Sequence, residues 1–334
     1  MAKKSTVLIL SICCLALAVL SGCAGRHSDE EHYYLVTANK GIPYWQSAAN
    51  GFVEGGNQMK VHAEVVGPDT YDPANEKDAF HALLAKNPKP AGILVSPADP
   101  EMMKPEIDAA IAAGIPVLTI DTDSPNSNRL FFVGTNNYEA GQLGAQVLAK
   151  QLNGKGNVIF FTMPNQVNLE ERMHGYKDVL EKYPGIKIGQ VVDIKGDPRI
   201  AFDTTQQMID KKDAVDGFVC LEAQAGKEVA TVLDNNHLTG KKVIVAMDTD
   251  DKTLEWIKKG AIAATVAQKP YTMGYVGIKM VDDYHHSEPD IAKMASTKGP
   301  SSPLPAFVDT GATLVDKNNV DEIIQSMQSQ GSKK

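Results

Sequence analysis

Acidic residues follow two apolar, strand-like runs of this sequence. Val117–Ile120 runs into Asp121 and Asp123, and Val243–Met247 runs into Asp248. Carboxylates at the carboxyl ends of buried parallel strands face the crevice in which open α/β sheets bind ligands. There an aspartate can accept two hydroxyl donors from neighbouring carbons of a sugar, in charge-assisted hydrogen bonds about twice as strong as neutral ones. These aspartates are therefore the first candidates for a ligand site.

Aromatic and amide side chains accompany the first predicted strand. Asn39, Tyr44 and Trp45 follow residues 33–38, at the predicted start of a helix. An aromatic face can stack on the C–H face of a sugar ring while carboxylates and amides bind its hydroxyls. Two plainer interpretations stay open: the aromatic pair is a hydrophobic contact at the helix start, and Asp121 is a helix cap.

Signatures of several common enzyme classes are missing from the sequence. No G-x-G-x-x-G follows the first strand, and no G-x-x-x-x-G-K-[ST], G-x-S-x-G, H-E-x-x-H or C-x-x-C occurs. Dinucleotide-dependent, P-loop and nucleophile-elbow chemistry is therefore not indicated, and we expect no cofactor. Asp121 does not open a calcium loop, because Asn126 and Phe132 stand where that loop requires glycine and glutamate.

A histidine pair near the carboxyl end offers ligands of the kind that metals prefer. His285 and His286 stand beside Asp282 and Asp283. We interpret this stretch as the solvated polar end of a helix in preference to a metal site, and expect no metal.

Residues 1–23 are typical of an export signal. An apolar core over residues 7–20 is shorter than the ~20 residues of a membrane-spanning helix. It closes on LSGC at positions 20–23, which resembles the lipobox of bacterial lipoproteins and implies cleavage before Cys23 and acylation of its thiol. Ordinary secretory cleavage beside an incidental cysteine is the alternative. Residues 24–32 would form a polar tether.

Charge and cysteine content narrow the possible partners. The formal charge is −8, with no basic cluster beyond the amino terminus, which argues against nucleic acid and against electrostatic binding to anionic lipid. Cys220 is the only cysteine beyond position 23. It lies in an apolar run, so we expect a small buried hydrophobe and no intramolecular disulfide.

Short β-branched runs alternate with stretches of helical period along the chain. This alternation predicts an α/β fold with parallel sheets, right-handed crossovers and helices on both faces. Ten strands are more than one doubly wound sheet usually contains, so we expect two doubly wound lobes that divide near residues 133–141. Asp121 and Asp248 would then face one cleft between them. The expected strands are 33–38, 61–66, 92–95, 117–120, 131–134, 158–162, 188–192, 217–221, 243–247 and 263–267.

Seven stretches in order carry a family resemblance: VTANKGIPYWQSAANGF, GILVSPADP, GIPVLTIDTD, VGTNNYEAGQLGA, AMDTDD, IAATVAQKPYTMGYVG and FVDTGATLVDKNNVDE. From residue 33 to about 324 the chain resembles a type I periplasmic binding protein, closest to the ribose-, xylose- and galactose-binding branch that serves sugar ABC transporters. The resemblance implies two lobes that are joined by a three-crossing hinge and close around one sugar. The N-terminal lobe would be 33–135 plus 269–300 and the C-terminal lobe 136–268 plus 301–330, with 307–315 as one strand forming the third crossing.

The resemblance also implies which residues bind the ligand. It gives Arg172 a largely structural role, and it assigns ligand contacts to Asn39, Tyr44, Trp45, Asp121, Asp248 and Gln268. Thr122 and Asp123 stand where the ribose and galactose proteins usually continue with arginine. Other departures place Glu170 or Asn168 at a ligand-binding arginine, Asp197 at a stacking aromatic, and Glu222 at an asparagine or aspartate.

The departures favour some ligands over others. A cleft with fewer arginines and more carboxylates disfavours acidic and phosphorylated sugars, because a buried anion would meet unpaired carboxylates. A neutral sugar or polyol fits it, and an amino sugar or another cationic ligand is the alternative.

We therefore expect a monomeric, lipid-anchored envelope protein, in the periplasm or on the outer face of the cytoplasmic membrane. It would capture a sugar without chemistry and deliver it to the permease of an ABC importer. A sensory protein that docks on a chemoreceptor or histidine kinase is a second possibility. An exported sugar-acting enzyme, pairing Asp121 with Glu170 or Glu222, is a third.

Overall fold

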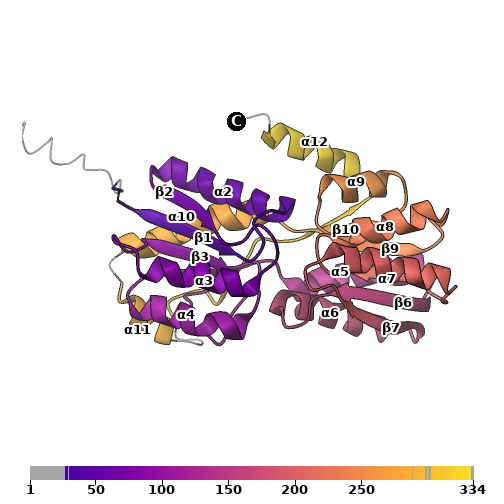
Figure 1. Cartoon of the computed structure of the whole chain (residues 1–334), viewed down its shortest axis with the longest axis horizontal. Coiled ribbons are helices and arrows are strands. Elements are labelled where there is room, and N and C mark those ends of the chain that lie inside the picture. Colours follow the sequence, from indigo (N-terminus) through magenta and orange to yellow (C-terminus); the bar gives the residue numbers. More distant parts are fainter. Residues whose placement is uncertain (1–26, 29, 288, 298, 300–301, 332–334) are drawn as a thin grey trace, which may run out of the picture.

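The alternating strands and helices form two lobes that lie side by side along the long axis of the molecule (Figure 1). This computed structural model describes residues 27–28, 30–287, 289–297, 299 and 302–331. The predicted signal segment and Cys23 lie outside the described residues. Within the described residues, no helix has the length and apolar character needed to cross a membrane.

The first lobe is built on a six-stranded sheet of order β11-β5-β4-β3-β1-β2, in which every neighbouring pair is parallel. The strand order reverses direction at β1, the point beside which doubly wound sheets bind ligands. The strands are β1 (His32–Thr37), β2 (His62–Val66), β3 (Gly92–Ser96), β4 (Val117–Ile120), β5 (Phe132–Gly134) and β11 (Phe307–Asp309).

The second lobe repeats this plan with the order β12-β10-β9-β8-β6-β7. Its only antiparallel pair among the described strands is β10 with β12. The strands are β6 (Lys155–Thr162), β7 (Gly185–Asp193), β8 (Gly217–Cys220), β9 (Val243–Met247), β10 (Ala264–Ala267) and β12 (Thr313–Asp316). The predicted α/β fold with two doubly wound lobes is confirmed.

Helices cover both faces of each sheet, and several begin where an aspartate accepts a backbone N–H and a proline follows. The first lobe carries α2 (Pro43–Met59), α3 (Pro73–Leu84), α4 (Pro100–Ala112), α10 (Pro270–His286) and α11 (Ile291–Ser296). The second carries α5 (Asn137–Gln151), α6 (Val167–Leu180), α7 (Pro198–Asp210), α8 (Ala225–Asn235), α9 (Asp251–Lys258) and α12 (Val320–Gly331).

The chain passes between the lobes three times, after β5, after β10 and after β11. The third crossing corrects the sequence-based prediction. Residues 307–315 are not one strand of the C-terminal lobe, because β11 pairs with β5 in the first sheet and β12 with β10 in the second. Gly311, at φ +80°, lies between them in a backbone conformation that side chains disfavour, which ends one strand before the next begins.

Burial follows from this layering. The central strands β3, β4 and β8 are buried along their whole length because helices pack on both faces. Cys220 is buried in the second core, as its apolar surroundings predicted.

Candidate ligand-binding site

A pocket of about 630 Å³, including its open mouth, lies between the two lobes. Side chains from the loops after β1 to β4 and after β6 to β10 line it. Because parallel strands present their carboxyl ends at one edge of a sheet, both sheets direct their loops into this shared space. The predicted cleft is therefore present, and both lobes contribute to it.

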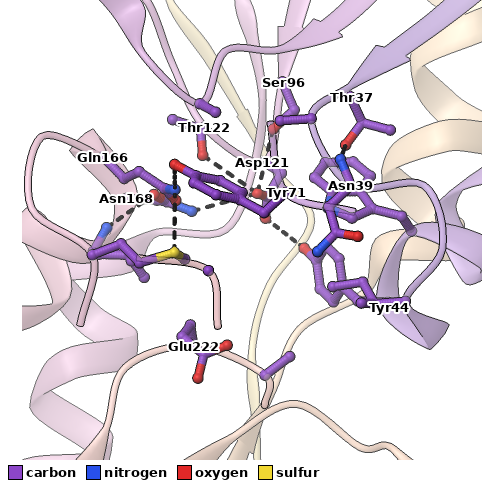
Figure 2. A pocket seen from close by; sticks show the side chains of 18 of the residues that line it. Thr37, Asn39, Tyr44, Tyr71, Ser96, Asp121, Thr122, Gln166, Asn168 and Glu222 are labelled. Carbon is purple, nitrogen blue, oxygen red and sulfur yellow. Dashed lines mark hydrogen bonds between the residues drawn. The ribbon is translucent and has the colours of Figure 1, made fainter. Parts of the chain in front are cut away.

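Asp121 organises the first-lobe side of the pocket (Figure 2). It is 7% exposed, and its backbone at φ 61° is in a left-handed conformation that aspartate tolerates better than most residues. Tyr44 donates its hydroxyl to Oδ1 at 2.5 Å. Longer contacts of 3.4–3.5 Å reach Oδ2 from Ser96, Thr122 and Asn168. Asn168 belongs to the second lobe, so this carboxylate contacts both lobes.

Burial raises the pKa of Asp121, and the Arg172 guanidinium opposes that rise. The pKa of Tyr44 is raised well above its usual value by burial and by the neighbouring carboxylate of Asp121. The phenol therefore keeps its proton and acts as the donor of the pair.

Asp248 occupies the equivalent place at the end of β9. It too is 7% exposed and has a positive φ of 65°. Gln268 donates from Nε2 to its two carboxylate oxygens at 3.1 and 3.4 Å. Burial raises the pKa of Asp248 to about 7, with Arg172 opposing the rise and Asp121 adding to it. This carboxyl is therefore poised to change protonation near neutral pH.

A buried arginine orients the glutamine that holds Asp248. Arg172 is 2% exposed and donates to Asn137 Oδ1 at 2.9 Å, to the Leu221 carbonyl at 2.7 Å and to Gln268 Oε1 at 2.7 Å. Because arginine can only donate, Gln268 must turn its oxygen toward Arg172 and its NH₂ toward Asp248. Arg172 thus has the structural role that the resemblance implied, and it also lines the pocket as a positive charge.

Glu222 lines the pocket apart from the cluster around Asp121 (Figure 2). Its carboxylate accepts the backbone N–H groups of Gln224 at 2.8 Å and Ala225 at 2.6 Å, at the start of α8. Burial raises its pKa. Glu222 therefore shapes the pocket wall and caps a helix with the same carboxylate.

The lobes touch across the pocket at two loops. Gln166 of the second lobe donates from Nε2 to the Tyr71 hydroxyl of the first at 3.0 Å. Gly196 faces the same tyrosine, and a Cβ built at this position would lie 2.4 Å from two atoms of the ring. Only glycine fits such an approach, and its φ of +72° also favours glycine. The structure thus has its two lobes in contact across the pocket.

The remaining predicted first-loop residues also reach the pocket. Asn39 is 8% exposed and its backbone N–H lies 3.4 Å from Thr37 Oγ1. Trp45 is 9% exposed and packs edge-on against Tyr44, with ring centroids 5.3 Å apart. Both line the pocket together with Tyr44.

Three predicted site residues do not line the pocket, and Asp123 is the first. Its carboxylate is bound by Arg129 at 2.6 and 2.5 Å and by the Thr119 hydroxyl at 2.6 Å. The extended conformation ends at Asp121, which has φ 61°, so strand alternation does not carry on to Asp123; Asp121 enters the pocket while Asp123 holds the loop of its own lobe.

The other two are Glu170 and Asp197. Glu170 is exposed and accepts the backbone N–H of Asn165 at 3.1 Å. Residues two apart on a helix do not share a face, so Asn168 and not Glu170 lines the pocket. Asp197 caps α7 through the backbone N–H of Arg199 and pairs with the Arg199 guanidinium.

Several lining residues were not among the predicted site residues. They include Ser96, Tyr71 and Gln166. Ser96 could have been found, because it directly follows a predicted strand at the same sheet edge as Asp121. Tyr71 and Gln166 could not, because their side chains meet only when the lobes approach each other.

The fold and the site together define a two-lobed binding protein that encloses its ligand between doubly wound lobes. Residues 33–288 match the family described as periplasmic binding protein domain. The chain therefore belongs to the periplasmic binding protein family, as the resemblance of its motifs predicted.

Known relatives extend this likeness over most of the chain. It is 24% identical over 295 residues to the ribose import binding protein of Haemophilus influenzae, covering 87% of this chain and 97% of the relative. The structure of a sugar-binding protein of a sugar ABC transporter from Bacillus halodurans is 34% identical, with a TM-score of 0.74 over 88% of this chain and 99% of that one. A carbohydrate transporter solute binding protein from Agrobacterium radiobacter, solved with D-arabinose, is 27% identical, with a TM-score of 0.80 over 90% and 99%.

Proposed function

We propose that this protein captures one neutral monosaccharide or polyol between its lobes and delivers it to an ABC importer. The observation that carries the proposal is the pair of buried carboxylates, Asp121 and Asp248, at equivalent strand ends of the two lobes. The hydroxyls of a sugar held between them would donate hydrogen bonds to both lobes at once. The relatives named for ribose and sugar binding support the same ligand class.

The charges in the pocket favour a neutral ligand. Asp121, Asp248 and Glu222 line it with a single arginine, Arg172. An anionic sugar would bring a further negative charge into a buried acidic site, at a cost in desolvation and repulsion. Raised pKa values lower the negative charge of the empty site, so the pocket does not require a cationic ligand.

Closure of the lobes would be the signal that the importer reads. Ligand can stabilise the closed arrangement only through a higher affinity for it than for the open one. The contact between Tyr71 and Gln166 is available only in the closed arrangement, and so is the approach of Asn168 to Asp121. We propose that the sugar leaves unchanged, because the pocket serves recognition and not turnover.

A thermal-shift panel tests the ligand class. Neutral pentoses, hexoses and polyols would be compared with amino sugars and sugar acids, with the mature protein purified in detergent. Ligand at about 100 times its dissociation constant should add roughly 2.7 kcal/mol of stability, which for a protein this large raises the melting temperature by a few degrees. A shift produced by a sugar acid or by an amine alone would contradict the proposal, and mass spectrometry of the recovered ligand would reveal turnover.

We further propose that Cys23 carries the lipid that holds the protein at the cell envelope, where it acts as a monomer. The LSGC stretch at residues 20–23 is the supporting observation. Metabolic labelling with a palmitate analogue should mark the wild-type protein but not Cys23→Ala. The variant should also be recovered in the soluble fraction. Membrane retention of unlabelled Cys23→Ala would contradict the anchor without affecting the sugar proposal.

A further inference from the structure

Two histidines and two carboxylates converge far from the pocket. Within the described residues, one group of this kind brings its ligand atoms within 4.8 Å of one another, and it consists of His27, Glu31, Asp282 and His286. The first two belong to the segment before β1, and the other two lie one helical turn apart at the end of α10. Residues from opposite ends of the chain therefore meet at a single point of the first lobe.

The burial of Asp282 and Glu31 corrects in part the sequence-based expectation of a solvated helix end. Asp282 is 2% exposed and Glu31 is 8% exposed, while Asp283 and His285 of the same stretch are exposed. Placing two carboxylates together in a buried site is costly unless positive charge accompanies them. A divalent cation would balance both.

Three distances between ligand atoms of the group are close to those around a tetrahedral metal, and all four atoms lie within 4.8 Å of one another. His27 Nε2 lies 3.2 Å from Asp282 Oδ2, and His286 Nε2 lies 3.3 Å from Asp282 Oδ1 and 3.0 Å from Glu31 Oε2. Zinc bonds of about 2.0–2.1 Å in a tetrahedron separate neighbouring ligand atoms by roughly 3.3 Å. The contacts are longer than charge-assisted N–H···O bonds typically are, at about 2.7–2.9 Å.

The carboxylates are also held from behind, as ligating carboxylates are in metal sites. The Tyr33 hydroxyl donates to Asp282 Oδ1 at 2.8 Å. The backbone N–H of Ser28 donates to Glu31 Oε1 at 2.6 Å, which leaves Oε2 directed at His286. Both acids are thus oriented before any ion binds.

We propose that His27, Glu31, Asp282 and His286 form a zinc site that fastens the amino-terminal segment to the end of α10. Imidazole nitrogen and carboxylate oxygen are ligands that zinc accepts, and four protein ligands close a structural site. The site is independent of the sugar pocket. If Cys23 carries lipid, as proposed above, the four residues from there to His27 span at most about 14 Å, so the ion would hold the first lobe close to the membrane.

Zinc titration of the chelator-treated, desalted mature protein tests the proposal. Calorimetry and metal analysis should find one zinc ion per chain, and Co²⁺ in its place should give the strong visible absorption of a tetrahedral site. His27→Ala lies in the segment before β1, where it does not disturb either core, and His286→Ala removes a second ligand. Each should weaken zinc affinity by more than about 100-fold, since even supporting residues around metal sites cost 10–100-fold.

His285→Ala is the matched control, because it neighbours the site without joining it, and His174→Ala is an exposed control in the second lobe. Both should bind zinc as the wild type does. Absence of stoichiometric binding, or equal binding by His27→Ala and His286→Ala, would overturn the proposal. The proposal would also be overturned if these variants lost the same melting temperature in zinc as in chelator. That result would mean that the four residues form ion pairs alone. Sugar affinity measured in chelator reports separately on the pocket.

Discussion

Asp121 and Asp248 occupy equivalent places in the two lobes and yet differ in how they are held. Each follows the third strand in the order of its sheet, β4 or β9. Each has a positive φ and donates its backbone N–H to the neighbouring strand, at Val133 and Val266. Asp121 accepts from Tyr44 and contacts three further side chains, whereas Asp248 accepts from the side chain of Gln268.

The difference teaches how a repeated fold can produce an asymmetric site. Repetition of the backbone fixes where the two carboxylates lie, and the surrounding side chains decide how each behaves. Asp121 serves as a preassembled contact between the lobes. The Asp248 carboxylate can still accept hydrogen bonds from a ligand. Because its pKa is about 7, the number of bonds it can accept depends on pH.

Replacing each aspartate by alanine should have unequal effects. Asp121→Ala removes the partner of Tyr44 and of Asn168 as well as a ligand contact, so we expect sugar affinity to fall by about 100-fold or more, roughly 3 kcal/mol. Asp248→Ala should cost about 10-fold. Calorimetric titration with the sugar identified by the thermal-shift panel measures both. Equal losses would remove the distinction between the two carboxylates.

Acidification should weaken binding if the sugar donates hydroxyls to ionised Asp248. Because burial raises the pKa of this group to about 7 in the empty pocket, affinity should fall below pH 7, with a slope that approaches tenfold per pH unit. Binding near pH 6.5 should release a proton, which titrations in buffers of different ionisation enthalpy detect. Asp248→Asn should bind more weakly at pH 8 but show a flat profile, and a slope that persists in this variant would assign the proton elsewhere.

Gly196→Ala tests whether contact between the lobes contributes to affinity. The added Cβ would collide with the Tyr71 ring, so we expect closure to be impaired and sugar affinity to fall by several-fold, with the melting temperature of the empty protein little changed. Gly260→Ala is a control that shares the positive φ but has no atom within 4 Å of the added Cβ. If Gly260→Ala loses as much sugar affinity as Gly196→Ala, backbone strain and not the interlobe contact explains the loss.

Glu76 offers a buried carboxyl of the first lobe that takes no part in the pocket. It is fully buried, its Oε2 accepts the backbone N–H of Ala98 at 3.0 Å, and burial raises its pKa to about 8. A carboxyl whose folded pKa is raised contributes stability below its unfolded pKa, and that stability is lost as pH rises toward 8. Glu76→Gln should lessen the fall in melting temperature between pH 6 and 9 by a few degrees and leave sugar affinity unchanged. An unaltered pH profile would contradict the raised pKa.

Some features of this protein follow from the residues in local order. The strand–helix alternation predicts both sheets, because hydrophobic periodicity and β-branched runs act within one element at a time. Asp121 and Asp248 were identifiable in the same way, since carboxyl ends of parallel strands share an edge. The position of Gln268 beside the hinge follows from the end of β10.

Other features depend on contacts between distant segments, which no local pattern reports. The division of residues 307–315 into β11 and β12 is decided by pairing with two different sheets. Asp123 was expected in the pocket because it follows the strand at 117–120, and Asp197 because the resemblance placed it at a stacking aromatic. Each instead pairs with an arginine close to it in the sequence, Arg129 or Arg199.

The tertiary structure alone brings His27 and Glu31 to Asp282 and His286. The sequence around Asp282 and His286 does not reveal their partners, because His27 and Glu31 lie about 255 residues earlier in the chain. Likewise the meeting of Tyr71 with Gln166 exists only when the lobes approach each other. Local sequence determines which side chains stand at strand ends and helix turns, and long-range packing determines which of them meet.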